Sequence, residues 1–121
     1  MLNIDNRKER KAVNTQFKKG ILELCVLSYL SEKDYYGYEL VEAVSVHINI
    51  SEGTVYPMLR RLNQENLVKT YIRESSSGPP RKYYHLTDSG KQYFQEQLSD
   101  WQSFSENVNK LLRRESGNQS G

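Results

Sequence analysis

Apolar residues recur along the chain at two spacings, one helical and one alternating, and together these spacings predict the order of the elements. Apolar side chains cover nearly all sides of residues 17–30, which is typical of a buried helix. A shorter helix with one apolar side is expected over residues 39–44. Residues 45–50 are poor helix formers, and we expect Ile48 and Ile50 to fill the core where the chain turns.

Residues 51–62 are the most informative segment, because they predict a helix with one buried side and one polar side. The buried side would hold Val55, Met58, Leu59 and Leu62. The flank and the opposite side carry hydroxyl, phenol and guanidinium groups, within the set Gly53, Thr54, Tyr56, Pro57, Arg60 and Arg61. Such groups contact phosphates and base edges in DNA-recognition helices. The same pattern also fits a surface helix with an ordinary solvated side.

The start of this helix contains two residues with opposite effects. Ser51 suits the N-cap position, where its hydroxyl would accept a hydrogen bond from a free backbone N–H. Pro57 lacks the N–H that would bond to the carbonyl of Gly53, and its ring crowds that carbonyl. We therefore expect either a kinked first turn or a regular helix that begins nearer Thr54.

After this helix the spacing becomes alternating, which predicts a β-hairpin. The two strands are expected over residues 68–73 and 81–86. A loop rich in serine, glycine and proline joins them over residues 75–80. Three helices followed by a basic hairpin describe a winged helix-turn-helix. The predicted fold class is therefore mainly α with a small β-hairpin (α+β), extended by a long C-terminal dimerisation helix.

That last helix has its own apolar pattern. Thr87 or Asp88 can cap it, and we expect it to run to about Arg114. A mostly apolar set of residues recurs at alternating spacings of four and three, as in a coiled coil. The seam consists of Phe94, Leu98, Trp101, Ser105, Val108 and Leu112, flanked by Phe104 and Leu111. Such a helix packs on its own domain or on a second copy of the chain.

The length of 121 residues suffices for one domain with a modest core, which a partner chain could complete. We divide it into a frayed or partly helical polar arm (1–16), a winged helix-turn-helix domain (17–87), a dimerisation helix (88–115) and a disordered tail (116–121). No apolar run is long enough to span a bilayer, and the first residues do not form a signal peptide. We expect a cytoplasmic protein with no membrane partner.

The distribution of charge is more informative than the formal net charge of +2. Residues 51–86 carry six basic and three acidic side chains, whereas residues 1–50 carry seven of each. The excess positive charge therefore lies in the amphipathic helix and the hairpin, as expected for a polyanion partner. Cys25 has no second cysteine to pair with, and its apolar neighbours indicate a buried structural thiol.

In three segments the chain resembles the PadR family of bacterial transcriptional regulators. The segments are YGYEL (36–40), SEGTVYP (51–57) followed by Leu59 and Leu62, and GPPRKYYHLTDSG (78–90). Their order and spacing form a specific signature within residues 17–115. The short C-terminal portion is similar to the small subgroup of the family, in which one helix makes the dimer.

The resemblance implies a homodimer that binds a pseudo-palindromic operator in double-stranded DNA and represses a nearby gene, often one for detoxification, drug efflux or stress response. The DNA contacts that it implies are Tyr38 in the second helix, Ser51, Thr54, Tyr56 and Arg60 in the third, and Arg81 and Lys82 in the wing. Arg61 joins them from the polar side of the third helix. In small, drug-responsive relatives a planar aromatic compound lies between the subunits against a tryptophan. Trp101 occupies the matching place, although it could equally pack the dimer seam alone.

Catalysis has little support in the sequence. His47 and His85 fall in different elements, and there is no metal-ligand spacing, Gly-rich phosphate loop or nucleophile elbow. We therefore expect no enzyme activity, no cofactor and no bound metal. A winged-helix protein-interaction module without sequence-specific DNA binding is the alternative, and the charge distribution favours DNA.

Overall fold

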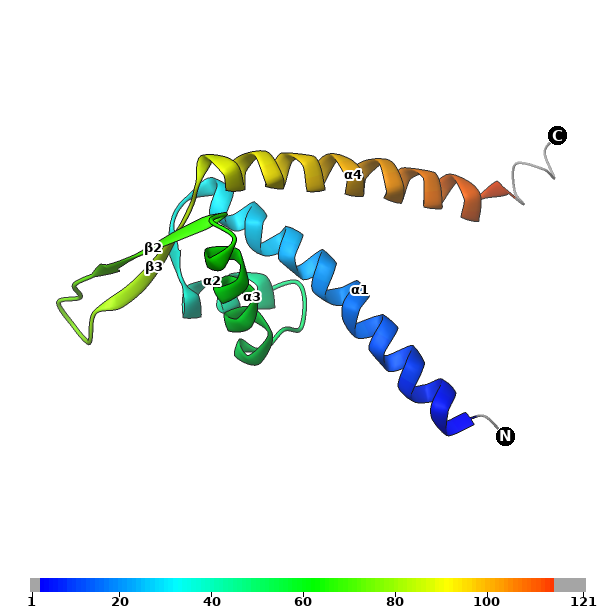
Figure 1. The fold of residues 1–121 in the computed structure, drawn as a ribbon, viewed down its shortest axis with the longest axis horizontal. Coiled ribbons are helices and arrows are strands. Elements are labelled where there is room, and N and C mark those ends of the chain that lie inside the picture. Colours follow the sequence, from blue (N-terminus) through cyan, green and yellow to red (C-terminus); the bar gives the residue numbers. More distant parts are fainter. Residues whose placement is uncertain (1–2, 115–121) are drawn as a thin grey trace.

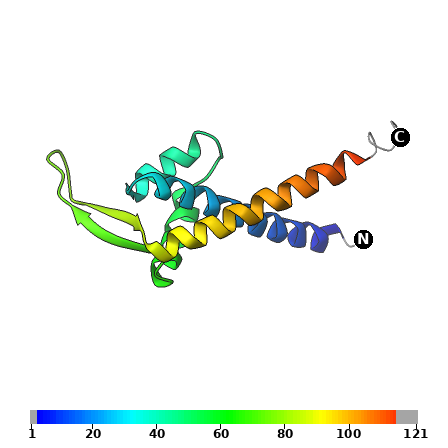
Figure 2. The same ribbon diagram turned by 90° about the horizontal axis from the view of Figure 1, so that it is seen from above.

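The computed structural model describes the backbone of residues 3–114 and the side chains of residues 17–114. The elements are α1 (Asn3–Glu32), β1 (Tyr35–Tyr36), α2 (Gly37–Ser45), α3 (Glu52–Gln64), β2 (Val68–Arg73), β3 (Arg81–Leu86) and α4 (Asp88–Leu112). The hairpin projects from one side of the helices (Figures 1 and 2), and the two long helices diverge on the other (Figure 1). This arrangement confirms the predicted α+β class, a winged helix-turn-helix with a long C-terminal helix. The tail over residues 116–121 lies outside the described residues.

The first helix is longer than the sequence pattern indicates. A frayed or partly helical polar arm is expected before residue 17, whereas α1 runs without a break from Asn3 to Glu32. The apolar pattern misses this extension because it reports burial, and the first residues are mostly polar. Their run of Lys, Arg and Glu nevertheless has high helix propensity, which favours continuing the helix toward the N-terminus.

The sheet has three strands, with β3 in the centre between β1 and β2. The hairpin strands coincide with the predicted ranges, and Val68 lies opposite Leu86 at one end while Arg73 lies opposite Arg81 at the other. Strand β1 was not predicted, because two residues are too short to show an alternating pattern. It pairs with β3 through Tyr35 opposite Tyr84 and Tyr36 opposite Tyr83.

The core lies where α1, α2, α3 and the base of the hairpin meet. Its fully buried side chains are Val26, Leu27, Leu40, Val44, Val55, Leu59, Leu62, Val68 and Leu86. As predicted, Ile48 and Ile50 pack against this cluster. Cys25 was expected to be buried but is only half-buried, and this partial burial raises the pKa of its thiol. The thiol is therefore held in its less reactive, protonated form.

The exit from α3 and the start of α4 are fastened to each other. Asn66 adopts φ 62°, and the N–H groups of Asn66 and Leu67 bond to the carbonyls of Asn63 and Leu62, which closes α3 with a Schellman turn. Thr87 caps α4 by accepting a hydrogen bond from the Gly90 N–H, and it donates to the carbonyl of Asn66 at 2.8 Å. The wing and the last helix are thus fixed to the end of α3.

No helix within residues 3–114 combines the length and the apolar character needed to cross a bilayer.

Candidate nucleic-acid interface

Helix α3 presents its polar side to solvent, as predicted. Val55, Met58, Leu59 and Leu62 are the buried residues of this helix. The other sides of α3 are exposed at Ser51, Gly53, Pro57 and Arg60, and half-buried at Thr54 and Tyr56. The helix begins at Glu52 and includes Pro57. Gly53 and Pro57 are both exposed, so water can reach the carbonyl that the proline leaves without a donor.

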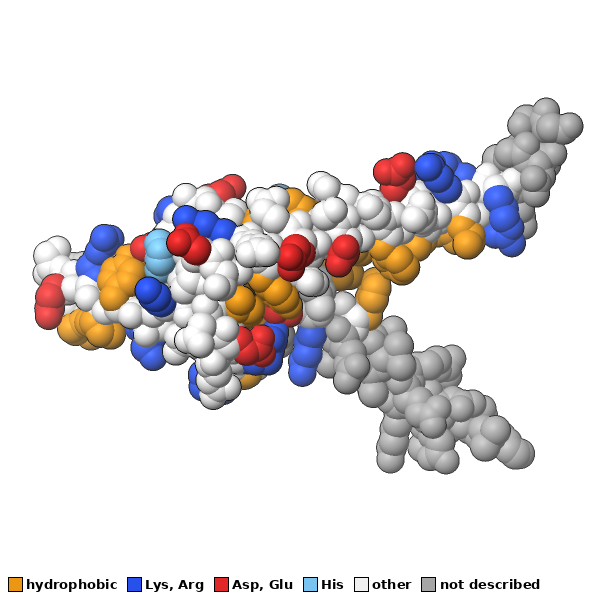
Figure 3. All heavy atoms as spheres, turned by 45° about the horizontal axis from the view of Figure 1, so that its top comes forward, with side chains coloured by type: hydrophobic (Ala, Val, Ile, Leu, Met, Phe, Trp, Pro, Cys, Tyr) orange, Lys and Arg blue, Asp and Glu red, His pale blue; other side chains and the backbone are white. Residues whose placement is uncertain are grey.

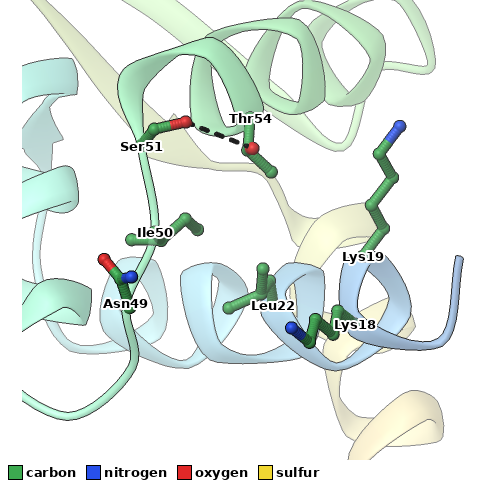
Figure 4. Close-up of a pocket in the computed structure, with 7 residues that line it drawn as sticks. All are labelled: Lys18, Lys19, Leu22, Asn49, Ile50, Ser51 and Thr54. Carbon is green, nitrogen blue, oxygen red and sulfur yellow. Dashed lines mark hydrogen bonds between the residues drawn. The ribbon is translucent and has the colours of Figure 1, made fainter. Parts of the chain in front are cut away.

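The hydroxyl of Ser51 does not play the predicted capping role. Ser51 is the N-cap residue, with extended backbone angles, but its side chain makes no cap hydrogen bond. It lies 3.5 Å from the Thr54 hydroxyl instead (Figure 4). At that distance the bond is weak. Both hydroxyls at the start of α3 therefore remain available to an external acceptor or donor.

A hollow of about 280 Å³ separates α1 from the start of α3. Lys18 and Lys19 line it from α1, and Asn49, Ser51 and Thr54 line it from the α3 side (Figure 4). Both lysines are exposed. Sequence reasoning assigned them to a buried helix and missed them, although two adjacent lysines in an apolar segment were the available signal. They add positive charge beside the polar side of α3.

The two tyrosines implied as DNA contacts differ in exposure. The side chain of Tyr38 in α2 is 50% exposed. The ring of Tyr56 is half-buried and lies so close to Gly37 that any side chain there would overlap it. Burial raises the pKa of Tyr56, which keeps its phenol protonated and able to donate a hydrogen bond at neutral pH.

The adjacent arginines of α3 have different surroundings. Arg61 forms ion pairs with Glu23 of α1 at 2.7 Å and with Glu65 at 2.9 Å. Hydrogen bonding to Glu23 raises the pKa of the Arg61 guanidinium. Arg60 is exposed and forms no ion pair with any residue whose side chain the structure describes. The prediction grouped both arginines at the interface, whereas Arg61 links α3 to α1.

Arg81 and Lys82 in the wing lie on opposite faces of the hairpin, because successive side chains of a strand alternate. Lys82 shares the face of Tyr84, which is buried against the core. Arg81 lies on the other face, with its guanidinium carbon 4.6 Å from the centre of the Tyr36 ring. The structure thus does not bring the two predicted wing contacts together on one surface.

The apolar seam of α4 divides into a part that packs inside the chain and a part that does not. Phe94 is 6% exposed and belongs to the core of its own chain, so it offers almost no surface to a partner. Leu98 also packs against the core. Ser105 and Val108 are half-buried. The exposed apolar residues are Trp101, Phe104, Leu111 and Leu112.

Between α4 and α1 lies a hollow of about 380 Å³. Phe17, Ile21 and Leu24 line it from α1, and Trp101 and Phe104 line it from α4. Apolar side chains follow the side of α4 that faces α1 in Figure 3. The structure therefore brings Trp101 into an apolar cleft that is open to solvent in a single chain.

Neither histidine has surroundings that suggest catalysis. His85 lies on the wing with its Nδ1 atom 2.7 Å from the Asp34 carboxylate, and His47 follows α2 on the surface. Within residues 17–114, no three His, Cys, Asp or Glu side chains come together as a metal site.

Comparison with known proteins identifies relatives of this arrangement. Residues 26–96 match the family model described as transcriptional regulator PadR-like. The crystal structure of a PadR-like transcriptional regulator from Bacillus cereus is similar at 42% sequence identity and a TM-score of 0.74, over 81% of this chain and 97% of that one.

Two curated relatives complete the comparison. Uncharacterized protein X of Lysinibacillus sphaericus is 33% identical over 83% of this chain and 95% of its own length. Transcriptional regulator YqjI of Escherichia coli is 32% identical over 76% of this chain. The match spans 44% of YqjI, which is therefore the larger protein. The family and this relative are described as transcriptional regulators, not enzymes.

Proposed function

The chain belongs to the PadR-like family of transcriptional regulators, and from this premise we propose that it binds double-stranded DNA through α3 and the wing. The observation that carries the proposal is the solvent-facing side of α3. It combines two weakly held hydroxyls with Arg60, which has no carboxylate partner among the described side chains. Hydroxyls and guanidinium groups read base edges and bind phosphates.

Basic side chains on both sides of α3 support the same proposal. Lys18 and Lys19 lie beside the start of the helix, and Lys82 lies on the face of the wing that is turned toward the core. A duplex whose major groove holds α3 has phosphate strands on each side of the helix. In the proposed complex the lysines contact those strands, and Arg60 and the hydroxyls enter the groove.

We further propose that the protein acts as a homodimer that represses transcription from a pseudo-palindromic operator. The exposed apolar residues of α4 and α1 support this proposal, because an apolar stripe of this kind is favourable only when covered. A second copy would cover it with the same stripe, as two-fold symmetry requires. The two α3 helices would then read half-sites about one helical turn of DNA, or about 34–36 Å, apart.

The cleft at Trp101 is the proposed place for an effector. Aromatic and aliphatic side chains make up most of its lining, and Gln97 and Asp100 of α4 add two polar groups. Such a lining suits a planar aromatic compound with a polar substituent. In a dimer this cleft would be adjacent to the partner subunit, so a ligand there would alter the relative placement of the two α3 helices. A melting-temperature screen against planar aromatic drugs and phenolic acids tests this, since a ligand of the native dimer raises Tm. Trp101→Ala should abolish that rise.

The DNA proposal is tested by fluorescence anisotropy with the duplex upstream of the protein's own gene, titrated over a range of salt concentrations. Binding through phosphates requires the logarithm of the association constant to fall linearly with the logarithm of salt concentration. The expected slope is about −0.9 for each phosphate neutralised. Absence of binding at low salt would contradict the proposal and favour a winged-helix module that binds protein.

A further inference from the structure

The outer face of the wing carries a row of aromatic rings beside a pair of arginines. Tyr36, Tyr83 and Tyr71 lie directly opposite one another on β1, β3 and β2, and so form one rung across the sheet. Two residues further toward the tip, Arg73 lies opposite Arg81 on the same face. Figure 3 shows apolar and basic side chains next to each other over the hairpin.

The rings and the guanidinium groups are in direct contact. The Tyr71 and Tyr83 rings stack with centres 5.6 Å apart, and Tyr36 meets Tyr83 edge to face at 5.5 Å. The guanidinium carbon of Arg81 lies 4.6 Å from the Tyr36 ring centre, and that of Arg73 lies 4.9 Å from the Tyr83 ring centre. Each arginine is therefore supported by a tyrosine of the neighbouring rung.

Neither arginine is neutralised by an ion pair within residues 17–114. The nearby Asp34 accepts hydrogen bonds from Tyr71 and His85, and Glu39 pairs with Lys33 at 3.2 Å. Two like charges placed directly opposite each other across neighbouring strands destabilise a sheet. The pairing of Arg73 with Arg81 thus has a cost in the free protein, and contact with the tyrosine rings opposes that cost.

A guanidinium that lies over an aromatic ring keeps its N–H edges free for other partners. Those edges match the oxygens of a phosphate, and a side chain already held in place loses less entropy on binding. A wing that lies along the minor groove has a phosphate strand on each side. Lys82 on the inner face and the two arginines on the outer face could then reach opposite strands.

We propose that Tyr36 and Tyr83 are positioning residues, which hold the guanidinium groups of Arg81 and Arg73 ready for backbone phosphates of duplex DNA. This inference rests on the proposed function and names the part of the wing that would supply phosphate contacts. In this proposal the tyrosines affect DNA affinity only through the arginines. A tyrosine that stacked directly on a DNA base would affect the affinity even if the arginine were absent.

The test is a double-mutant cycle measured as the affinity for a short mixed-sequence duplex labelled with fluorescein, at several low salt concentrations. Tyr36→Leu removes the ring beneath Arg81 and should weaken binding about two- to fivefold, the range expected for an exposed cation–π contact. Arg81→Ala should weaken binding and reduce the salt slope by about 0.9. In the Arg81→Ala background, Tyr36→Leu should cause no further loss.

Tyr36→Phe is the matched control, since it keeps the ring and should bind as tightly as the unsubstituted protein. Arg81→Lys tests the same contact without altering the core, because it keeps the charge but loses the planar group. It should weaken binding about two- to fivefold. Urea unfolding of every variant separates loss of fold from loss of binding.

Several results would overturn the inference. Tyr36→Leu could weaken binding equally with and without Arg81, Arg81→Lys could bind normally, or Tyr36→Phe could bind as poorly as Tyr36→Leu. If the unsubstituted protein showed no salt-dependent binding to any duplex, the proposed function itself would fail. Normal, salt-dependent binding by a folded Tyr36→Leu variant would leave the proposed function intact and reject only the role of the tyrosine.

Discussion

The ring of Tyr56 on α3 lies against the backbone of Gly37 at the start of α2. A Cβ atom placed on Gly37 would overlap the Cε1 atom of that ring and would lie 2.8 Å from its hydroxyl oxygen. This contact sets how closely the two helices approach at the end of α3 that would enter the DNA. The glycine is therefore required by the space available, and its backbone conformation is ordinary.

Gly37→Ala should move Tyr56 or separate α2 from α3. Overpacking of this kind costs about 1–3 kcal/mol, and urea unfolding would measure the loss. Affinity for duplex DNA should fall as well, because α3 would be displaced. Gly20→Ala is a suitable control, since nothing lies within 4 Å of its added methyl group. It should raise the free energy of unfolding by about 0.5–1 kcal/mol, because alanine favours a helix. Equal stability of the two variants would contradict the packing argument.

Arg60 and Arg61 are adjacent in sequence and offer a comparison between a proposed DNA contact and an observed ion pair. Arg60→Ala should lower DNA affinity and its salt slope without changing the free energy of unfolding. Arg61→Ala should lower the free energy of unfolding and leave the salt slope unchanged. Among the side chains of residues 17–114, it leaves the Glu23 carboxylate, which is 16% exposed, with a single long hydrogen bond from Tyr93. A stability loss of about 1 kcal/mol is expected, since the pair is partly screened by solvent. The pair of predictions fails if Arg61→Ala reduces the salt slope as much as Arg60→Ala does.

The sequence predicted the parts of this fold that have a strong local pattern. The two wing strands matched their predicted ranges because alternating apolar and polar residues mark the strands and the loop residues mark where they end. The buried side of α3 matched because helical spacing determines it. Strand β1 is too short to carry a pattern, and its pairing with β3 depends on a contact between distant parts of the chain.

The candidate site was harder to predict, because adjacent residues can have different partners. The partner of Arg61 is Glu23, on another helix, and spacing within α3 cannot reveal it. Arg81 and Lys82 are neighbours in sequence, yet strand alternation places them on opposite faces. Alternation could have separated them in advance. The contact between Arg81 and the Tyr36 ring could be predicted only from the register in which β1 pairs with β3.

Asp34 joins the loop after α1 to both strands of the wing. Its carboxylate accepts hydrogen bonds from the Tyr71 hydroxyl and from His85, each at 2.7 Å. Partial burial opposes ionisation of Asp34, but these two bonds and the nearby charge of Arg73 hold its pKa below the ordinary value. The bond also raises the pKa of Tyr71, so its hydroxyl remains a donor.

The stability that Asp34 contributes should therefore depend on pH. Because the pKa is lower in the folded state, the contribution is present above the unfolded value of about 3.9 and is lost as pH falls through the folded value. Asp34→Asn should lower the urea midpoint at neutral pH and flatten its fall below about pH 4. Tyr71→Phe should weaken the same dependence while keeping the ring stack. Tyr38→Phe, an exposed tyrosine outside this cluster, should leave the pH profile unchanged. If the urea midpoint of Asp34→Asn fell below pH 4 as steeply as that of the unsubstituted protein, other carboxylates would be responsible for the loss of stability in acid.

Phe104 is the most direct test of the proposed dimer, because it is 58% exposed in a single chain and lines the cleft beside Trp101. Phe104→Ser should weaken dimerisation by about 2 kcal/mol, or about thirtyfold in the dissociation constant, if the ring lies near the centre of the interface. Sedimentation equilibrium at several protein concentrations measures this directly. Ser103→Gln is the control, since residue 103 is exposed and its neighbours three and four residues away on α4 are all polar. The free energy of unfolding of each chain at concentrations below the dissociation constant should be similar for the two variants, because Phe104 lies outside the core. A Phe104→Ser protein that stays dimeric would place the interface elsewhere, whereas a monomeric Ser103→Gln protein would mean that the polar side of α4 makes the contact.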